Sequence, residues 1–450
     1  MDNGARALLG AVATGLAPLP GTAGPGRTDD GPLNWPGYGH DRARSQARSG
    51  EAESVLCGTG RIGGHEVVLI AFEFGYIGGS IGEDAGARIV AALTEARRRQ
   101  VPAVSLIATG GSRMQEGVRS LRQLQLIAAE CAANRAAGIP HIAVLRDPTT
   151  GGVWASLGAG ADIHIGVRGA TLAFAGGRVR GDASGAGTGE DFLAEGKYRA
   201  GQLDQLVDFD ELPAVLARLV DLLANRPGAD PAPVPYALGR TDLPPDGWTA
   251  VRWARDPARP RARAYLDDYF QTRVPLRGDR AGGVDRGLLC GIGRHAGRTI
   301  AFAAQTGTAT TAAGFRTATR LIQLADRLRL PVLTIVDTPG ATNDAAAERD
   351  GIGPAIAGVF AAIAQARVPV TTLVVGEGGS GGALALASPQ RLWICPDAYF
   401  SVIDVPAAAR ILKRDAGDVP VLADQLRIRP QDLLADGLVT GIAEPRPGNA

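Results

Sequence analysis

Two glycine pairs in this sequence stand where chemistry on a negatively charged oxygen could take place. Gly151 and Gly152 follow a short β-branched run at residues 142–145 and precede an apolar run at residues 153–157. A strand, a glycine turn and a helix in this order leave unpaired N–H groups at the helix start, where the helix dipole favours negative charge. The stretch therefore suits an oxyanion hole for an enolate or a thioester oxygen. Glycine turns also occur without any function, so one copy leaves both readings open.

The same pattern occurs a second time. Residues 374–386 again run from an apolar strand through glycines, among them Gly382, into an apolar helix that begins near Ala383. The interval from Gly110 to Gly340 equals the interval from Gly152 to Gly382. An interval held across two separate turns predicts the internal duplication of a whole domain.

The elements that must position these turns alternate between strands and helices. The first half predicts a hairpin at residues 54–72 around Gly63 and Gly64, a helix at 83–99, a strand at 103–107 and a helix at 114–136. Pro148 is expected to end the strand before the first turn. The second half repeats the order, so each half is expected to be an α/β layered domain.

Length and composition predict the domain boundaries. The chain has 450 residues, too many for one core, so two domains are expected. Residues 1–50 are rich in Gly, Pro, Ala and Arg and are predicted to form a disordered extension. The domains are predicted at 51–225 and 246–450, and a Pro-, Gly- and Asp-rich linker at 226–245.

Charge and rare residues narrow the classes of function. The net charge is +1, which gives no basic excess for nucleic acid or an anionic membrane. The four cysteines lie far apart without a CxxC motif, which favours a reducing compartment and argues against a zinc ribbon. The five histidines lack an HExxH spacing, so no metal is expected. No apolar run is long enough to span a bilayer.

The motifs also resemble a known family, the carboxyltransferase of bacterial acetyl-CoA carboxylase. Its β subunit is resembled by residues 72–82, 110–116, 147–153 and 174–179, and its α subunit by residues 276–280, 337–341, 376–385 and 401–403. The resemblance implies two tandem crotonase-like (ClpP-like) ββα-spiral domains in a cytoplasmic enzyme. That enzyme would move a carboxyl group from carboxybiotin on a carrier protein to the α-carbon of an acyl-CoA, with acetyl-CoA giving malonyl-CoA as the expected case.

The resemblance assigns roles to individual residues. Gly151 and Gly152 would hold the acyl-thioester enolate, and Gly382 with Ala383 the biotin ureido oxygen, so no side-chain base is required. Glu116 and Glu377 are accordingly interpreted as structural. Substrate binding is expected at Gly79, Ser80, Gly110, Gly111, Arg113, Phe174, Ala175 and Arg178, and biotin binding at Gly340, Gly379, Ser380 and Gly381. Arg113 and Arg178 could pair with CoA phosphates, and structural ion pairs are the alternative.

The resemblance also implies partners, and departures from the family leave other functions open. A biotin carboxyl carrier protein, a biotin carboxylase and a homodimer or higher oligomer are expected, with the site between halves of two chains. The family's zinc ribbon has no cysteines here in residues 1–50, and Asp404-Val405-Pro406-Ala407 replaces the usual Ser-Pro-Glu-Gly. The alternatives are a biotin-independent malonyl-thioester decarboxylase and a non-catalytic scaffold subunit.

Overall fold

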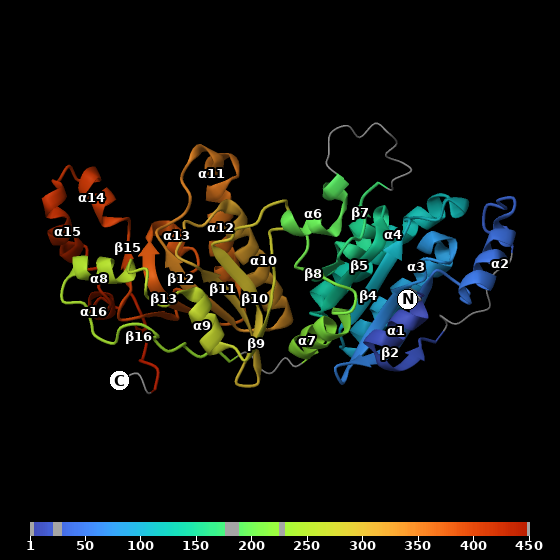
Figure 1. Ribbon diagram of the computed structural model, residues 1–450, viewed down its shortest axis with the longest axis horizontal. Coiled ribbons are helices and arrows are strands. Elements are labelled where there is room, and N and C mark those ends of the chain that lie inside the picture. The colour runs from blue at the N-terminus through green and yellow to red at the C-terminus, as the bar shows by residue number, and fades with distance from the viewer. Residues whose placement is uncertain (1–3, 21–28, 176–188, 225–229, 448–450) are drawn as a thin grey trace. The chain divides into compact units, whose positions relative to one another are not determined.

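The computed structural model describes residues 4–20, 29–175, 189–224 and 230–447 and divides into two compact units, Met1–Asn225 and Arg226–Ala450 (Figure 1). Each unit holds one eight-stranded sheet with helices packed against it. The α/β domain pair expected from the sequence is confirmed.

The first unit orders its strands β1-β2-β3-β4-β5-β6-β8, with β7 paired to β5. The strands are β1 (Thr14–Pro18), β2 (Val55–Ile62), β3 (His65–Phe72), β4 (Ala103–Thr109), β5 (His141–Thr150), β6 (Ile163–Val167), β7 (Leu172–Ala173) and β8 (Gln205–Val207). The helices are α1 (Ala5–Val12), α2 (Tyr38–Ser49), α3 (Glu83–Arg99), α4 (Val118–Ala136), α6 (Ala194–Arg199) and α7 (Leu212–Ala224). Short 3-10 helices are η1 (Ile77–Gly79), η2 (Met114–Glu116) and η5 (Gly189–Phe192), and η3 (Trp154–Gly158) is a π-helix.

The second unit repeats this order as β9-β10-β11-β12-β13-β14-β16, with β15 paired to β13. The strands are β9 (Thr272–Pro275), β10 (Leu288–His295), β11 (Arg298–Gln305), β12 (Val332–Thr338), β13 (Val370–Gly379), β14 (Leu392–Ile394), β15 (Tyr399–Ser401) and β16 (Gly441–Ile442). The helices are α8 (Gly247–Ala254), α9 (Ala262–Tyr269), α10 (Ala312–Leu328), α11 (Ala345–Arg349), α12 (Ile352–Gln365), α13 (Ser380–Leu384), α14 (Val405–Ile411), α15 (Val419–Gln425) and α16 (Pro430–Ala435), with a short turn, η6 (Ala416–Asp418).

The two units match in register, with an offset one position shorter than the glycines suggest. Isolated bridges join Ile81 to Ser112 in the first unit and Thr310 to Ala341 in the second, and both partners recur at the same offset. The pairs α3/α10, β4/β12 and β5/β13 keep that offset from end to end. The interval read from the sequence therefore aligned the wrong glycines. Gly340 is the counterpart of Gly111, and Gly381 is the counterpart of Gly152.

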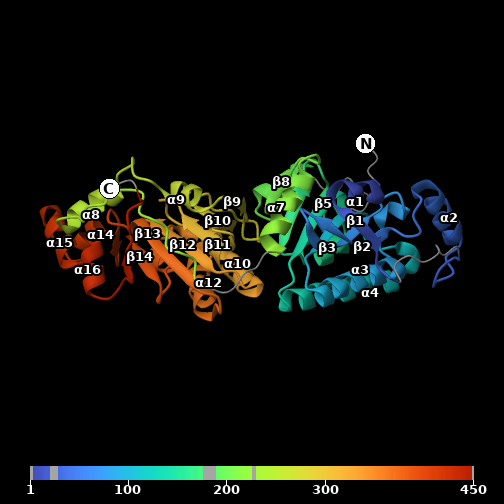
Figure 2. The ribbon, with the colours of Figure 1, turned by 90° about the horizontal axis from the view of Figure 1, so that it is seen from below.

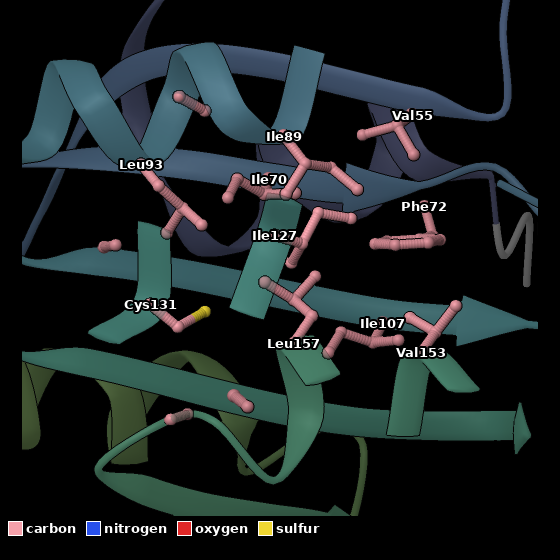
Figure 3. Close-up of a cluster of buried hydrophobic side chains, with 14 of the residues drawn as sticks. Val55, Ile70, Phe72, Ile89, Leu93, Ile107, Ile127, Cys131, Val153 and Leu157 are labelled. Carbon is pink, nitrogen blue, oxygen red and sulfur yellow. The ribbon is translucent and has the colours of Figure 1, made fainter. Parts of the chain in front are cut away.

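The core of the first unit lies between the sheet and helices α3 and α4. Figure 2 shows these helices along one face of the sheet, with α1 and α7 on the other face. Apolar residues of α3 and α4 meet strand residues, and Val153 and Leu157 from the first glycine turn enter the same cluster (Figure 3). Because both residues are fully buried, the core fixes where the turn begins.

Three sequence-based expectations need correction. Residues 4–20 and 29–50 are not disordered, because α1, β1 and α2 form there and β1 pairs with β2. Pro148 does not end its strand, since β5 continues to Thr150 and β7 pairs with its last residues. The described part of the linker packs on the second unit, where Thr371 Oγ1 donates to the carbonyl of Ala232. The hairpin at residues 54–72 is confirmed.

Candidate active site

The first glycine turn leads from β5 into η3. Gly151 has a φ of +71°, a conformation that favours glycine, and it packs against Gly111 of the neighbouring loop. The Gly151 N–H already donates to the carbonyl of Ala173 at 3.1 Å. The Gly152 N–H has no hydrogen-bond partner among the described residues. Gly152 is therefore the open donor of this pair.

The tip of a side chain from α4 lies beside position 152. A Cβ added to Gly152 would lie 2.2 Å from Leu124 Cδ1, closer than real carbon contacts. Leu124 packs against the core cluster that also holds Val153. The turn is thus held on one side by the core and on the other by α4, which fixes the direction of its free amide.

The second glycine turn leads from β13 into α13. Ser380 holds a φ of +57°, an uncommon conformation for a residue with a side chain. A Cβ on Gly382 would lie 2.3 Å from the backbone N of Ala341, whereas one on Gly381 would meet nothing within 4 Å. The N–H groups of Ser380, Gly381 and Gly382 have no acceptor within α13, because they occupy its first three positions.

Ala383 occupies the fourth position of α13. A regular α-helix would bond this N–H to the carbonyl of the N-cap residue Gly379, but the described residues show no such bond, and Ser380 at the first position is left-handed. In the pair Gly151–Gly152 one amide is engaged inside the fold and one is open, whereas the assignment of the Gly382 and Ala383 amides to a negative oxygen stays a prediction.

The second turn opens into a hollow of about 380 Å³ within the second unit. Ser380 and Gly381 form part of its wall, and Leu384, Phe400 and Val402 supply apolar surface. Arg427 and Asp436, which form an ion pair at 2.7 Å, also line it. Sequence reasoning missed these last two residues, because nothing in their spacing marks them as neighbours of a turn that lies much earlier in the chain.

The loops predicted to bind substrate lie beside the first turn. Gly79 has a φ of +63°, and a Cβ there would lie 2.2 Å from the carbonyl oxygen of Ala108. Ser80 is buried, and its hydroxyl donates to the carbonyl of Ile77. The Gly110 N–H donates to Gly78, and the Gly111 N–H to Thr109 Oγ1 at 3.0 Å. These glycines let two loops approach each other closely, and the N–H groups of Gly110 and Gly111 are already engaged.

Arg113 does not reach solvent. Its side chain is 0% exposed and pairs with Glu53 and, at 3.3 Å, with Glu116. Burial alone would lower the pKa of Arg113, but the Glu53 carboxylate outweighs it and raises that pKa. Burial acts to raise the pKa of Glu53, yet Arg113 holds it below its usual value. Arg113 is therefore a structural ion-pair residue, and the expectation that it binds a CoA phosphate is wrong.

The remaining first-unit residues lie after β7. Phe174 is 72% exposed, which leaves a large apolar ring on the surface beside the turn. Ala175 is half-buried next to it. Arg178 lies outside the described residues.

In the second unit, the loop beside the turn mirrors the first. Gly340 has a φ of +145°, and its N–H donates to Thr338 Oγ1 at 3.1 Å, as Gly111 does to Thr109. A Cβ on Gly379 would lie 2.2 Å from the carbonyl oxygen of Pro339. Gly340 is therefore favoured by its backbone conformation and Gly379 is required by close backbone packing, whatever they bind.

Carboxylates near the second turn have structural partners. Arg255 bonds Glu377 at 2.7 Å and Asp404 at 2.6 Å, and Tyr399 also donates to Glu377. Glu377 is thus paired, as its structural interpretation predicts. Asp404, at the departure from the family pattern, caps α14 by accepting from Ala407.

The described residues offer neither a cluster of metal ligands nor a thiol with the pKa of a nucleophile. Within them, no group of three or more His, Cys, Asp or Glu side chains could hold a metal ion. All four cysteines are free and buried, and burial raises the pKa of the thiols of Cys57, Cys131 and Cys290 to about 12. None of these three thiols has the low pKa that a nucleophile needs. No helix of the described segments is long and apolar enough to cross a membrane.

Comparison with known proteins places this geometry in a family. The family model "Carboxyl transferase domain" matches residues 38–213, and "Acetyl co-enzyme A carboxylase carboxyltransferase-like" matches residues 244–450. The carboxyl transferase subunits beta/alpha of acetyl-coenzyme A carboxylase from Salinispora arenicola are 37% identical over 433 residues, 91% of this chain and 76% of the relative. The chain belongs to the biotin-dependent acyl-CoA carboxylase carboxyltransferases.

Other relatives agree with this membership. A probable biotin-dependent acyl-coenzyme A carboxylase beta3 subunit from Mycobacterium tuberculosis is 33% identical over 424 residues, 92% of this chain and 84% of that protein. Transcarboxylase 12S, solved as a hexamer assembly with methylmalonyl-coenzyme A bound, matches with a TM-score of 0.80 and 21% identity, over 98% of this chain and 87% of that one. The carboxyltransferase has the same fold as transcarboxylase 12S.

Proposed function

We propose that this carboxyltransferase moves a carboxyl group from carboxybiotin to the α-carbon of acetyl-CoA, giving malonyl-CoA. The observation that carries the proposal is the pair of equivalent turns, each with an open amide held by close packing. Gly152 offers its N–H in the first unit, and Gly381 and Gly382 offer theirs in the second. Acetyl-CoA is proposed because the Salinispora relative carries that substrate in its name.

The chain's own residues supply binding and charge stabilisation. The Gly152 amide donates to the thioester oxygen as the enolate forms, and the first amides of α13 donate to the ureido oxygen. Preformed donors of this kind lower a barrier because they need no reorganisation as charge develops. Carboxybiotin supplies the carboxyl group when bound, and the hollow beside Ser380 and Gly381 offers a partly apolar wall for its ring.

The proposal includes a biotin carboxyl carrier protein, a biotin carboxylase and an assembly in which halves of two chains face each other. Large apolar side chains exposed on both units support that assembly, since surfaces of this kind commonly mark interfaces. They are Met114, Val118, Leu121 and Phe174 in the first unit, and Leu384, Val402, Ile411, Leu412 and Leu438 in the second. A catalytically active monomer in solution would contradict this part.

The test is to supply malonyl-CoA with and without free biotin or a biotinylated carrier. Decarboxylation that depends on biotin supports the proposal. Decarboxylation at full rate without biotin would replace it with a biotin-independent malonyl-thioester decarboxylase. Inertness towards acyl-CoA and carrier-protein thioesters would leave a scaffold subunit.

A further inference from the structure

A second hollow, of about 450 Å³, lies in the first unit between α1, β1, β2 and α3. Figure 2 shows α1, β1 and β2 beside one another. None of its lining residues belongs to either glycine turn. Two of its walls, α1 and β1, precede residue 38, where the first family match begins. Part of the wall of this hollow therefore comes from a segment that lies outside the residues matched by the carboxyltransferase family models.

The walls of this hollow are mainly apolar. Leu9 comes from α1, Leu16 and Pro18 from β1, and Leu56 from β2. Leu16 is 43% exposed, so one wall presents uncovered aliphatic surface. The volume falls in the range of about 300–1,000 Å³ that is typical of small-molecule sites. An apolar group placed there would remove this surface from water.

The charged side chains that line the hollow leave it with a net positive charge. Arg88 of α3 is half-buried, and its guanidinium donates to the carbonyl of Val55 at 3.2 Å. Among the described residues no carboxylate forms an ion pair with it. Glu51, the acidic residue of the lining, is paired in two places with Arg6 at 2.8 Å. The lining therefore carries one positive charge without a carboxylate partner in the described segments, set against apolar walls.

The thiol in the same wall does not neutralise that charge. Cys57 is buried, and burial raises the pKa of its thiol to about 12 despite the nearby Arg88. A planar guanidinium with free N–H groups matches a carboxylate, because two parallel hydrogen bonds form at once. One unpaired cation calls for one negative charge on the ligand.

We propose that this hollow binds a monoanionic carboxylate with an apolar tail. The carboxylate lies on Arg88, and the tail lies against the leucines of α1, β1 and β2. The site is separate from the carboxyl-transfer turns and does not depend on the function proposed for them.

Isothermal titration of the full-length protein with sodium octanoate tests the site. Octanoate is expected to bind at least about tenfold more tightly than octylammonium, which carries the same tail and the opposite charge. Arg88→Gln is expected to weaken octanoate binding about tenfold or more, while Arg88→Lys weakens it less. Arg61→Gln is the matched control, since Arg61 lies on the same strand as Leu56 but does not line the hollow.

A second variant tests the apolar wall without touching the charge. Leu16→Gln is expected to weaken both octanoate and 1-octanol, whereas Arg88→Gln weakens octanoate alone. Thermal melts of each variant confirm that it is folded. Equal binding of octanoate and octylammonium, unchanged octanoate binding in a folded Arg88→Gln protein, or no octanoate binding to the unaltered protein would overturn the proposal.

Discussion

The two units share a backbone plan and support it with different side chains. Beside each turn a threonine hydroxyl accepts the amide of the loop glycine: Thr109 for Gly111 and Thr338 for Gly340. The residue that begins each turn is left-handed in both units, as glycine in one and Ser380 in the other. Hydrogen bonding and register were kept after the duplication, while the side chains around them diverged.

The largest divergence lies in the support of the loop that crosses the turn. In the first unit, Arg113 is buried among Glu53, Glu116 and Arg42. The counterpart of Arg113 in the second unit, at the same offset as the bridges, is Thr342, whose hydroxyl reaches the carbonyl of Thr310 at 3.4 Å. Buried ion pairs support the loop of the first unit, whereas uncharged hydrogen bonds support the loop of the second unit. The same backbone therefore responds differently to loss of its supports.

Replacement of Arg113 should have the largest effect on stability. Arg113→Met leaves Glu53 and Glu116 with less compensation in a buried site, and such a loss costs about 3–5 kcal/mol. The measurement is the free energy of unfolding by denaturant, followed by a signal from the first unit. Thr342→Val, the counterpart in the second unit, is expected to cost about 1 kcal/mol or less. Equal losses for the two variants would show that the charge cluster is not the support.

Alanine at Gly152 should lower turnover strongly. The new methyl group meets the tip of Leu124, and the prediction is that the turn shifts with that side chain, so its amide moves away from where the enolate oxygen develops. Loss of one such donor reduces kcat by on the order of 100-fold or more. Steady-state carboxyl transfer measures this, and adding Leu124→Ala should return part of the lost rate by giving the methyl group room.

The matched control is Gly381→Ala, at the equivalent position of the second turn. A Cβ there meets nothing within 4 Å, and alanine is the better helix former. The unfolding free energy of this variant should be unchanged or slightly higher. A clear loss of unfolding free energy in Gly381→Ala would contradict the open space that the structure shows at this position.

Acid should destabilise the first unit through a buried histidine that the second unit lacks. His141 bonds Ser105, and burial lowers its pKa to about 4, whereas the counterpart in the second unit is Val370. Between pH 6.5 and 4 the unfolded chain binds a proton that the folded chain does not, so stability falls as pH drops through this window. The contribution approaches about 3 kcal/mol below pH 4.

Denaturant unfolding at several pH values measures this slope. The double variant His141→Val with Ser105→Ala should flatten the pH dependence between pH 6.5 and 4, because it removes the proton and its partner together. An unchanged slope would mean that other groups cause the acid sensitivity.

Much of the fold could be predicted from the sequence, because local patterns determine it. Strand runs, helix periodicity and glycine turns all lie within short windows. The register between the units could not be predicted, because Gly378, Gly379, Gly381 and Gly382 allow alignments one position apart. The pairing of Thr310 with Ala341 and the matching bounds of β5 and β13 decide between them.

The burial of Arg113 was beyond local patterns for a different reason. Glu53 lies 60 residues away, and Tyr38 and Arg42 come from a stretch whose composition suggested disorder. An arginine two positions after a pair of glycines looks like a phosphate ligand until its distant carboxylates are placed. Burial of charge is a property of the tertiary structure, so sequence spacing alone cannot reveal it.

The mechanism rests on an open main-chain amide at the first turn that holds the acceptor's oxygen. A crystal structure of the assembled protein with a bound acyl-CoA examines this contact itself. We expect the thioester oxygen at about 2.7–3.1 Å from the Gly152 nitrogen. A well-ordered thioester whose oxygen bonds other groups and leaves the Gly152 amide unpaired would contradict the mechanism.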